Sequence, residues 1–371
     1  TGLVLDPYFS ATKWHWMLAN TAGLRERAEK GDVAFGTVDS YLIARLTGNR
    51  RHVTDVTNAS RTLLLNLQTR QWDAELCRYF GVPQAALPEV LPSAADFGVT
   101  AGAGFLPDGL PIAGVAGDQQ AALFGQCAFG PGGAKCTYGT GAFFLVHIGD
   151  KPVLSRHKLV TTVAAMTSET PEYALEGSVF VAGAAVQWLR DGLKLFRDAA
   201  EVEALAGRSD AEQPVLFVPG FVGLGAPHWE PEARGALFGL TRNTTAADLA
   251  RAALEGVAYQ VVDLIDAARP DQPTPLAELR ADGGMARNDW FLQCQADLLG
   301  LPVLAAAETE STALGAAYLA GLKVGVWPDR EHLRKLAGEL RRFEPRLEAE
   351  ERARRLERWR KAVRAVITFA Q

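Results

Sequence analysis

Apolar positions recur at helical spacing in several segments of this chain. Residues 36–48 have helical spacing and end at Gly48, which predicts a short helix closed by a glycine. Thr245 and Asp248 form a capping-box-like start to a second helix. After it, apolar residues recur at helical spacing and predict a stripe facing the core: Leu249, Ala253, Val257, Val261 and Leu264.

Several segments read as a strand, a turn of small residues and then a helix. Ile112–Val115 is a short apolar run, Gly117 allows a sharp turn, and Gln119–Phe124 has the small residues of a packed helix. The same order is expected in residues 173–193, 279–300 and 303–322. Strands that alternate with helices from end to end predict an α/β fold.

Two other features complete this organisation. β-rich runs flank Gly139-Thr140-Gly141, which predicts a hairpin with a glycine turn. Residues 347–371 predict a charged amphipathic helix.

We place a domain boundary near Gln126, which gives domains of residues 1–126 and 127–371. The chain has no short repeat of fixed period, which argues against a solenoid.

Composition narrows the class of protein. The chain has 371 residues, of which 48% are hydrophobic and 22% charged, and a formal net charge of −5. An acidic chain with interspersed charges argues against a nucleic-acid or anionic-membrane surface. Its four cysteines form no C-x-x-C pair and no zinc spacing. We therefore expect buried thiols in a reducing cytoplasm, and we find neither a signal peptide nor a membrane-span-length apolar run.

Phosphoryl transfer from a nucleotide needs a phosphate site, a metal and a base for the attacking hydroxyl. The phosphate candidate is the turn at residues 137–141, where glycines let backbone N–H groups approach phosphate oxygens and the Thr140 hydroxyl adds a donor. The alternative is a plain tight hairpin. The chain lacks the G-x-x-x-x-G-K-[ST] pattern, which disfavours a Walker-type fold.

Asp118 is the candidate base. It follows an apolar run and lies between Gly117 and Gln119, where a carboxylate can accept the proton of a hydroxyl. The alternative is an N-cap aspartate for the following helix, and the two roles are compatible.

Two pairs are candidates for nucleotide contacts: Gly183 with Gln187, and Gly284 with Asn288. In each pair the glycine lies at a strand-to-helix turn, and the polar residue lies one helical turn later. The alternative for both glycines is close packing of helix on strand. Aromatic candidates for a small-polyol pocket are Tyr8, Trp14, Trp16 and Phe143, although core or surface packing suits the two tryptophans better.

Long motifs in a fixed order give the chain a family resemblance. It resembles the FGGY carbohydrate kinases in "YFSATKWHW", "GTVDSYLIARLTG" and "GALFGLTRNTTAADLARAALEGVAYQ". Within that family it is similar to the members that act on glycerol rather than on a pentulose. The segments that carry this closer likeness are "DVTNASRT", "GDQQAALFGQ", "TYGTGAF" and "GLGAPHWEPEARG".

The resemblance implies an actin-like, ribonuclease-H-like fold of two domains with the active site in the cleft between them. It implies ATP-dependent phosphorylation of glycerol to sn-glycerol 3-phosphate, with Asp118 as catalytic base and Mg²⁺ ligand. The implied ATP contacts are Thr140, Gly183, Gln187, Gly284 and Asn288. The implied glycerol contacts are Tyr8, Asp118, Gln119 and Phe143. We also expect a homo-oligomer, either a dimer or a tetramer.

The chain departs from the family pattern in two places. It begins at Thr1 inside folded-looking sequence, so we expect an absent preceding segment with a further phosphate hairpin, and no glycerol phosphorylation by this chain alone. Residues 101–114 contain no lysine or arginine, so inhibition by fructose 1,6-bisphosphate is not expected. The alternatives are a sister pentulose or gluconate kinase and a non-catalytic sugar-kinase-like binding protein.

Overall fold

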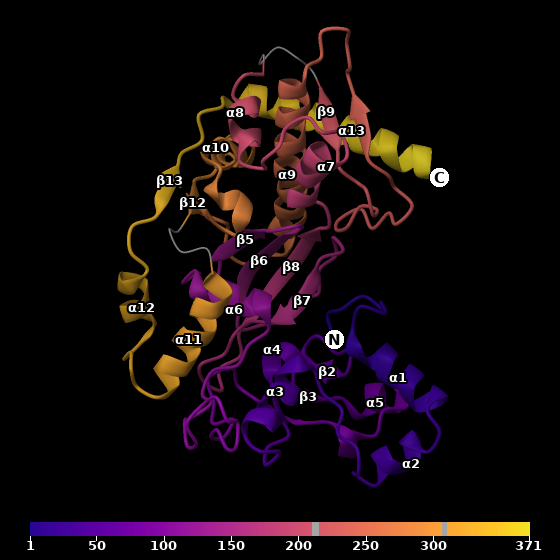
Figure 1. Cartoon of the computed structure of the whole chain (residues 1–371), viewed down its shortest axis with the longest axis vertical. Coiled ribbons are helices and arrows are strands. Elements are labelled where there is room, and N and C mark those ends of the chain that lie inside the picture. Colours follow the sequence, from indigo (N-terminus) through magenta and orange to yellow (C-terminus); the bar gives the residue numbers. More distant parts are fainter. Residues whose placement is uncertain (210–214, 306–309) are drawn as a thin grey trace.

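A computed structural model describes residues 1–209, 215–305 and 310–371. The first part of the chain, indigo to purple in Figure 1, is built of helices and very short strands. Its elements are α1 (Ser10–Asn20), α2 (Leu24–Glu29), α3 (Val38–Leu46), β1 (Val53–Asp55), α4 (Val56–Ala59), β2 (Leu65–Asn66), β3 (Gln71–Trp72), α5 (Ala74–Phe80), the 3₁₀ turn η1 (Gln84–Ala86) and β4 (Glu89–Leu91).

The rest of the chain carries the longer strands and helices. Its elements up to the longest helix are α6 (Asp118–Gly125), β5 (Ala134–Tyr138), β6 (Ala142–Gly149), β7 (Val160–Val163), β8 (Tyr173–Val179), α7 (Gly183–Asp191), α8 (Glu201–Ala206), β9 (Leu216–Val218), β10 (Ala236–Phe238) and α9 (Ala246–Ala268). After it come η2 (Arg269–Asp271), β11 (Leu279–Asp282), η3 (Gly284–Arg287), α10 (Asp289–Leu299), β12 (Val303–Ala305), α11 (Ser311–Lys323), α12 (Arg330–Leu336), β13 (Arg341–Phe343) and α13 (Ala349–Ala370).

A seven-stranded mixed sheet organises this larger part, in the order β13-β12-β11-β5-β6-β8-β7. Strand β5 lies at its centre, parallel to β11 and antiparallel to β6. The pairing of Tyr138 with Ala142 closes the hairpin at Gly139-Thr140-Gly141, which confirms that prediction. In Figure 1 helices α6 and α11 lie on one side of the central strands, while α7, α9 and α10 lie on the other.

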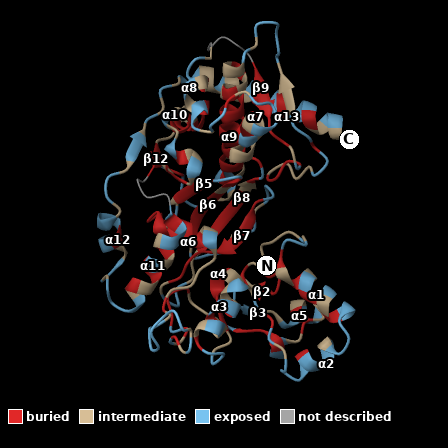
Figure 2. Cartoon of the chain, in the orientation of Figure 1, coloured by how far each residue is buried: buried red, intermediate tan, exposed pale blue. Residues whose placement is uncertain are grey.

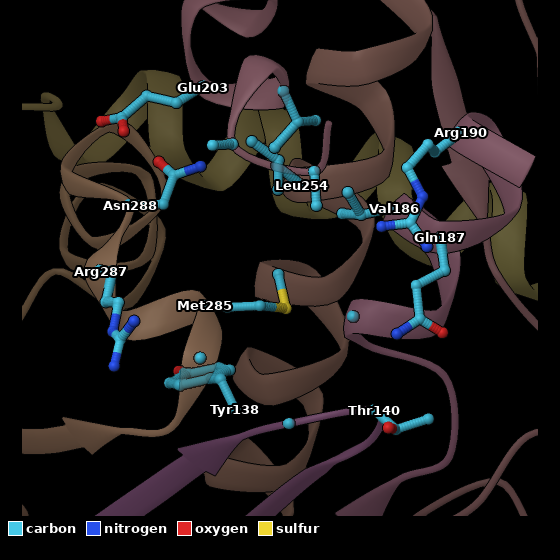
Figure 3. Close-up of a pocket in the computed structure, with 16 residues that line it drawn as sticks. Tyr138, Thr140, Val186, Gln187, Arg190, Glu203, Leu254, Met285, Arg287 and Asn288 are labelled. Carbon is cyan, nitrogen blue, oxygen red and sulfur yellow. The ribbon is translucent and has the colours of Figure 1, made fainter. Parts of the chain in front are cut away.

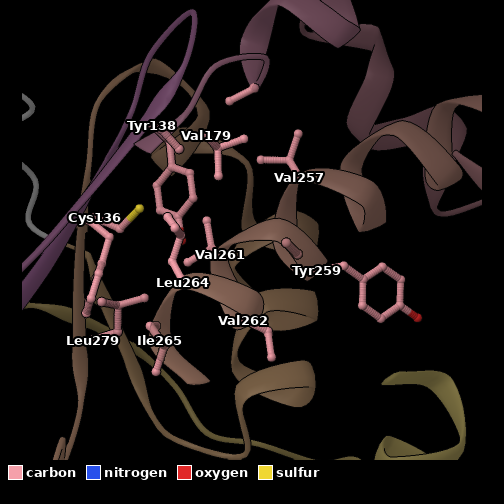
Figure 4. Close-up of a cluster of buried hydrophobic side chains, with 14 of the residues drawn as sticks. Cys136, Tyr138, Val179, Val257, Tyr259, Val261, Val262, Leu264, Ile265 and Leu279 are labelled. Carbon is pink, nitrogen blue, oxygen red and sulfur yellow. The ribbon is translucent and has the colours of Figure 1, made fainter. Parts of the chain in front are cut away.

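The main core fills the space between this sheet and α9. Figure 2 shows the central strands and α9 in red along most of their length. In Figure 4, Cys136 and Tyr138 of β5 face apolar side chains of α9, among them Val257, Val261 and Leu264. The predicted apolar stripe is confirmed, and α9 begins with the predicted capping box of Thr245 and Asp248. The α9 side of the sheet is therefore covered by closely packed apolar side chains.

Most predicted elements form, but one does not. The helix within residues 36–48 and the tail helix form as α3 and α13. Ile112–Val115 is not a strand, although it was predicted as one. Its backbone bonds irregularly, with the Ile112 N–H donating to Gly98 O and the Val115 N–H to Ser93 O, so no ladder forms. The turn expected between β12 and α11 falls at residues 306–309, outside the described residues.

The cysteines and helices add two observations. Cys77, Cys127 and Cys136 are buried free thiols, as expected, whereas Cys294 is partly buried. Within the described ranges, none of the helices combines the length and the apolar character needed to span a bilayer.

Candidate active site

A pocket of about 410 Å³ lies at the end of the central strands, between the hairpin turn and helices α7 and α10. It brings together residues that are distant in sequence. All five candidate nucleotide residues line it: Thr140, Gly183, Gln187, Gly284 and Asn288. Figure 3 shows Asn288 and Arg287 on one side, Gln187 and Arg190 of α7 across from them, and Met285 between. Its size and its mixed apolar and polar lining suit a nucleoside.

The two glycines of this pocket have different surroundings. A Cβ at Gly183 would lie 2.6 Å from the carbonyl oxygen of Gly139, so this glycine is needed for the close approach of α7 to the hairpin. A Cβ at Gly284 would meet nothing within 4 Å. The packing explanation therefore fits Gly183, whereas the space beside Gly284 is open.

Asn288 has a structural task besides facing the pocket. Its Oδ1 accepts from the Phe291 N–H at 2.8 Å, so Asn288 is the N-cap of α10. This bond leaves the Nδ2 group as a donor, and Figure 3 shows that nitrogen on the side of the pocket. The pocket thus receives a hydrogen-bond donor whose orientation is set by a helix cap.

Asp118 begins α6 at the end of the irregular segment before it. The N-cap of α6 is Gly117 and not Asp118, so the N-cap alternative for Asp118 is wrong. One carboxylate oxygen of Asp118 accepts from the Gln119 N–H at 2.8 Å, and the residue is exposed. The carboxylate is therefore free to meet a substrate hydroxyl.

A buried network fixes the backbone just before Asp118. The Thr57 hydroxyl donates to Asp55 at 2.8 Å and accepts from the Gly117 N–H at 2.7 Å. The Asp55 carboxylate is fully buried and also accepts from Asn58 and Ser93. Burial, followed by the charge of Asp39, raises the pKa of Asp55 to about 6. These contacts tie the turn at Gly117 to the first part of the chain.

Gln119 follows Asp118 in α6, and Phe143 lies on β6. The Gln119 side chain accepts from the Lys135 ammonium of β5. Phe143 pairs with Thr137 across the hairpin, which puts both side chains on one face of the sheet, the face that also carries Lys135. The structure thus places Gln119 next to Asp118, and Phe143 on the face of the sheet that α6 covers.

The structure gives Tyr8 no contact with the other polyol candidates among the described residues. Its side chain is 69% exposed and stacks edge-on against Phe9. Trp14 is buried against Phe35, and Trp16 is exposed.

Sequence reasoning missed three polar residues of the site: Asp55, Thr57 and Lys135. The signals were present but weak. Asp55 precedes a helix and Thr57 follows at the spacing of an N-cap contact. Lys135 is a single charge within an apolar strand, where a buried partner is expected. Each signal predicts that the residue has polar partners nearby. It does not predict that the residue supports the turn at Gly117 and Asp118.

A magnesium ion fits Asp118 only as a site with a single protein carboxylate. Among the described residues, no group of three or more histidine, cysteine or acidic side chains is arranged to hold a metal ion. Magnesium in phosphotransfer sites is held by one or two carboxylates together with waters and substrate phosphates. One exposed carboxylate at Asp118 fits that mode, since waters and the phosphates of a bound nucleotide would supply the remaining oxygens.

Comparison with known proteins identifies the family of the chain. Domain models of the FGGY family of carbohydrate kinases match residues 1–125 (N-terminal domain) and 134–324 (C-terminal domain). The chain is 54% identical over 371 residues to a glycerol kinase of Trichlorobacter lovleyi, covering 100% of this chain and 75% of that protein. It is 56% identical over 369 residues to a glycerol kinase of Xanthobacter autotrophicus, covering 99% of this chain and 74% of that protein.

Solved structures agree on the fold. The crystal structure of Plasmodium falciparum glycerol kinase with ADP matches with a TM-score of 0.93 and 37% identity, covering 99% of this chain and 73% of that chain. A gluconate kinase from Lactobacillus acidophilus matches with a TM-score of 0.86 at 23% identity, over 99% of this chain and 74% of the other, and shows the fold alone. The expected two-domain kinase fold is thereby confirmed, and this chain belongs to the FGGY family of carbohydrate kinases.

Proposed function

We propose that this protein transfers the γ-phosphoryl group of ATP to glycerol and forms sn-glycerol 3-phosphate and ADP. The observation that carries the proposal is the identity above 50% to proteins named glycerol kinase over essentially the whole chain. The pocket lined by the candidate nucleotide residues supports it, since its size and lining suit a nucleoside. We propose ATP as the donor because the structurally similar Plasmodium falciparum enzyme was solved with ADP.

In the proposed reaction Asp118 is the general base. Its exposed carboxylate accepts the proton of a primary hydroxyl while the hydroxyl oxygen attacks the γ-phosphorus, and the bond from that phosphorus to the bridging oxygen of ADP breaks. The fixed turn at Gly117 keeps this carboxylate in place, so little reorganisation is needed when the substrate arrives.

The other candidates hold the two substrates. We assign the Thr140 hydroxyl and the neighbouring backbone to the phosphates, and Asn288 and Gln187 to the nucleoside. Gln119 and Phe143 hold the polyol, the first through hydrogen bonds and the second by covering its carbon chain. Bound Mg²⁺, with Asp118 as one ligand, would neutralise charge on the phosphates. We retain Tyr8 as a polyol contact on the resemblance alone.

A coupled ADP-release assay tests the proposal. This chain spans about three quarters of the length of its glycerol kinase relatives, so the assay uses the protein at the relatives' full length, with ATP and glycerol, a pentulose, gluconate or no acceptor. We expect the highest kcat/KM with glycerol and negligible ADP release without an acceptor. A higher kcat/KM with a pentulose or gluconate would replace the substrate assignment, and nucleotide binding without turnover on any acceptor would favour a binding protein.

A further inference from the structure

Lys135 is a charged side chain in the middle of the large sheet. It lies on the central strand β5, and 0% of its surface is exposed. Burial lowers the pKa of Lys135, because an ammonium group taken out of water loses its hydration. A lysine at this position needs partners that replace the lost water.

Its immediate partners are neutral oxygens. The Nζ group donates to Oε1 of Gln119 and, at 2.8 Å, to the Thr137 hydroxyl. Carboxylates act from farther away, and the largest of these charge effects comes from Asp282, which is 3% exposed on the neighbouring strand β11. Glu176 contributes as well, although both of its oxygens bind Arg61 at 2.9 Å.

The bond to Gln119 has a directional consequence. A glutamine amide has an oxygen that accepts and a nitrogen that donates, whereas an ammonium group can only donate. Lys135 therefore selects the orientation in which Oε1 points into the core. The Nε2 group must then point the other way, and Gln119 is partly exposed next to Asp118. The hydrogen-bond network assigns this orientation.

We propose that Lys135 is a positioning residue that orients the Gln119 amide so that Nε2 donates to a hydroxyl oxygen of the acceptor polyol. This inference rests on the proposed function. The turn then offers the polyol one donor, Gln119 Nε2, and one acceptor, the Asp118 carboxylate. A hydroxyl that accepts from the first and donates to the second is fixed in direction, with its oxygen ready for attack.

Without the Lys135 ammonium, the Gln119 amide can flip and exchange the positions of Oε1 and Nε2. In part of the molecules Oε1 of Gln119 then faces the substrate. The polyol meets two hydrogen-bond acceptors, Gln119 Oε1 and the Asp118 carboxylate, and no donor from this turn. The loss of one neutral hydrogen bond corresponds to a rise of about three- to tenfold in the KM for glycerol. The nucleotide pocket does not include Lys135 or Gln119, so KM for ATP is expected to stay within about twofold of the wild type.

A double-mutant cycle tests the proposal. Lys135→Met keeps the length of the side chain and suits a buried position. We expect Lys135→Met and Gln119→Ala each to raise KM for glycerol about three- to tenfold. In the Gln119→Ala background, Lys135→Met should add nothing, because its effect passes through Gln119. Effects on KM that multiply in the double variant would overturn the proposal.

A second variant separates this role from a contribution to folding. Gln119→Glu keeps an oxygen for Lys135 but presents no donor to the substrate, so we expect the same rise in glycerol KM as for Gln119→Ala. Wild-type KM in Gln119→Glu would refute the inference. If Lys135→Met does not fold, Lys135→Met with Asp282→Asn removes both buried charges and is used in the cycle. If the wild type prefers another acceptor, the cycle is run on that acceptor, so failure of the proposed function and failure of this inference give different results.

Discussion

The nucleotide pocket and the turn around Asp118 hold their functional groups in different ways. The pocket is open and is formed by backbone turns, two helix starts and a glycine with empty space beside it, Gly284. The turn is held from both sides by buried side chains. Thr57 and Asp55 fix its backbone from the first part of the chain, and Lys135 fixes Gln119 from the sheet.

This difference suits the ligand that each region is proposed to bind. A nucleoside is large, so shape and a few donors are enough to place it. A small polyol offers only hydroxyl groups, and catalysis needs one of them directed at phosphorus within a fraction of an ångström. Substitutions around the turn should therefore change turnover or the KM for glycerol, whereas substitutions in the pocket should change nucleotide affinity.

The largest expected effect is on the turn. Asp118→Asn should lower kcat about 10²–10⁴-fold, the usual contribution of a general base. Its carboxylate bonds only to the adjacent Gln119 N–H among the described residues, and an asparagine oxygen can take that bond, so stability should change little. ADP affinity, measured by calorimetry, should also stay near that of the wild type. Near-normal turnover with glycerol would remove Asp118 from the role of base.

The next effect concerns the buried support of the turn. Burial, followed by the charge of Asp39, raises the pKa of Asp55 from 3.8 to about 6, so the folded protein binds this proton more tightly than the unfolded chain does. The stability that the proton contributes is present below pH 3.8 and is lost as pH rises through about 6. The difference corresponds to about 3 kcal/mol. Asp55→Asn cannot titrate, so its unfolding free energy relative to the wild type should improve by up to about 3 kcal/mol between pH 4 and 7.

Urea unfolding across this pH range measures the effect, and Asp73 supplies a control of opposite sign. A hydrogen bond from Asn66 is the main cause that lowers the pKa of Asp73, so its stabilisation is present at neutral pH and lost in acid. Asp73→Asn should therefore lose relative stability as pH rises. Parallel stability curves for Asp55→Asn and the wild type would contradict the buried-carboxylate interpretation.

The pocket could be predicted from the sequence better than the supports of the turn. Gly284 and Asn288 follow a strand and precede a helix, so a local pattern is enough to place them at one end of a sheet. Thr57 and Gly117 are 60 residues apart, and no local pattern joins them. The wrong strand at Ile112–Val115 has the same origin, since its irregular backbone bonds to Gly98 and Ser93 depend on tertiary packing.

A smaller change should act on the pocket alone. Gly284→Val introduces a side chain where a Cβ meets nothing within 4 Å, so the fold should tolerate it while the pocket loses volume. We expect at least about a tenfold loss of ADP affinity, or ~1.4 kcal/mol, with glycerol KM unchanged. Gly207→Val is a matched control, because it also avoids close contacts but does not line the pocket. Equal losses of ADP affinity in the two variants would contradict a nucleotide role for Gly284.

The smallest effect separates the two tasks of Asn288. Asn288→Asp keeps an oxygen for the Phe291 N–H and hence the cap of α10, but it replaces the Nδ2 donor with an acceptor. Asn288→Ala loses both, and an N-cap lost in this way costs about 0.5–2 kcal/mol of stability. We expect both variants to weaken ADP binding measurably in calorimetry, while only Asn288→Ala unfolds earlier in urea. If Asn288→Asp binds ADP as the wild type does, the residue serves the helix alone, and recognition in the pocket rests on shape.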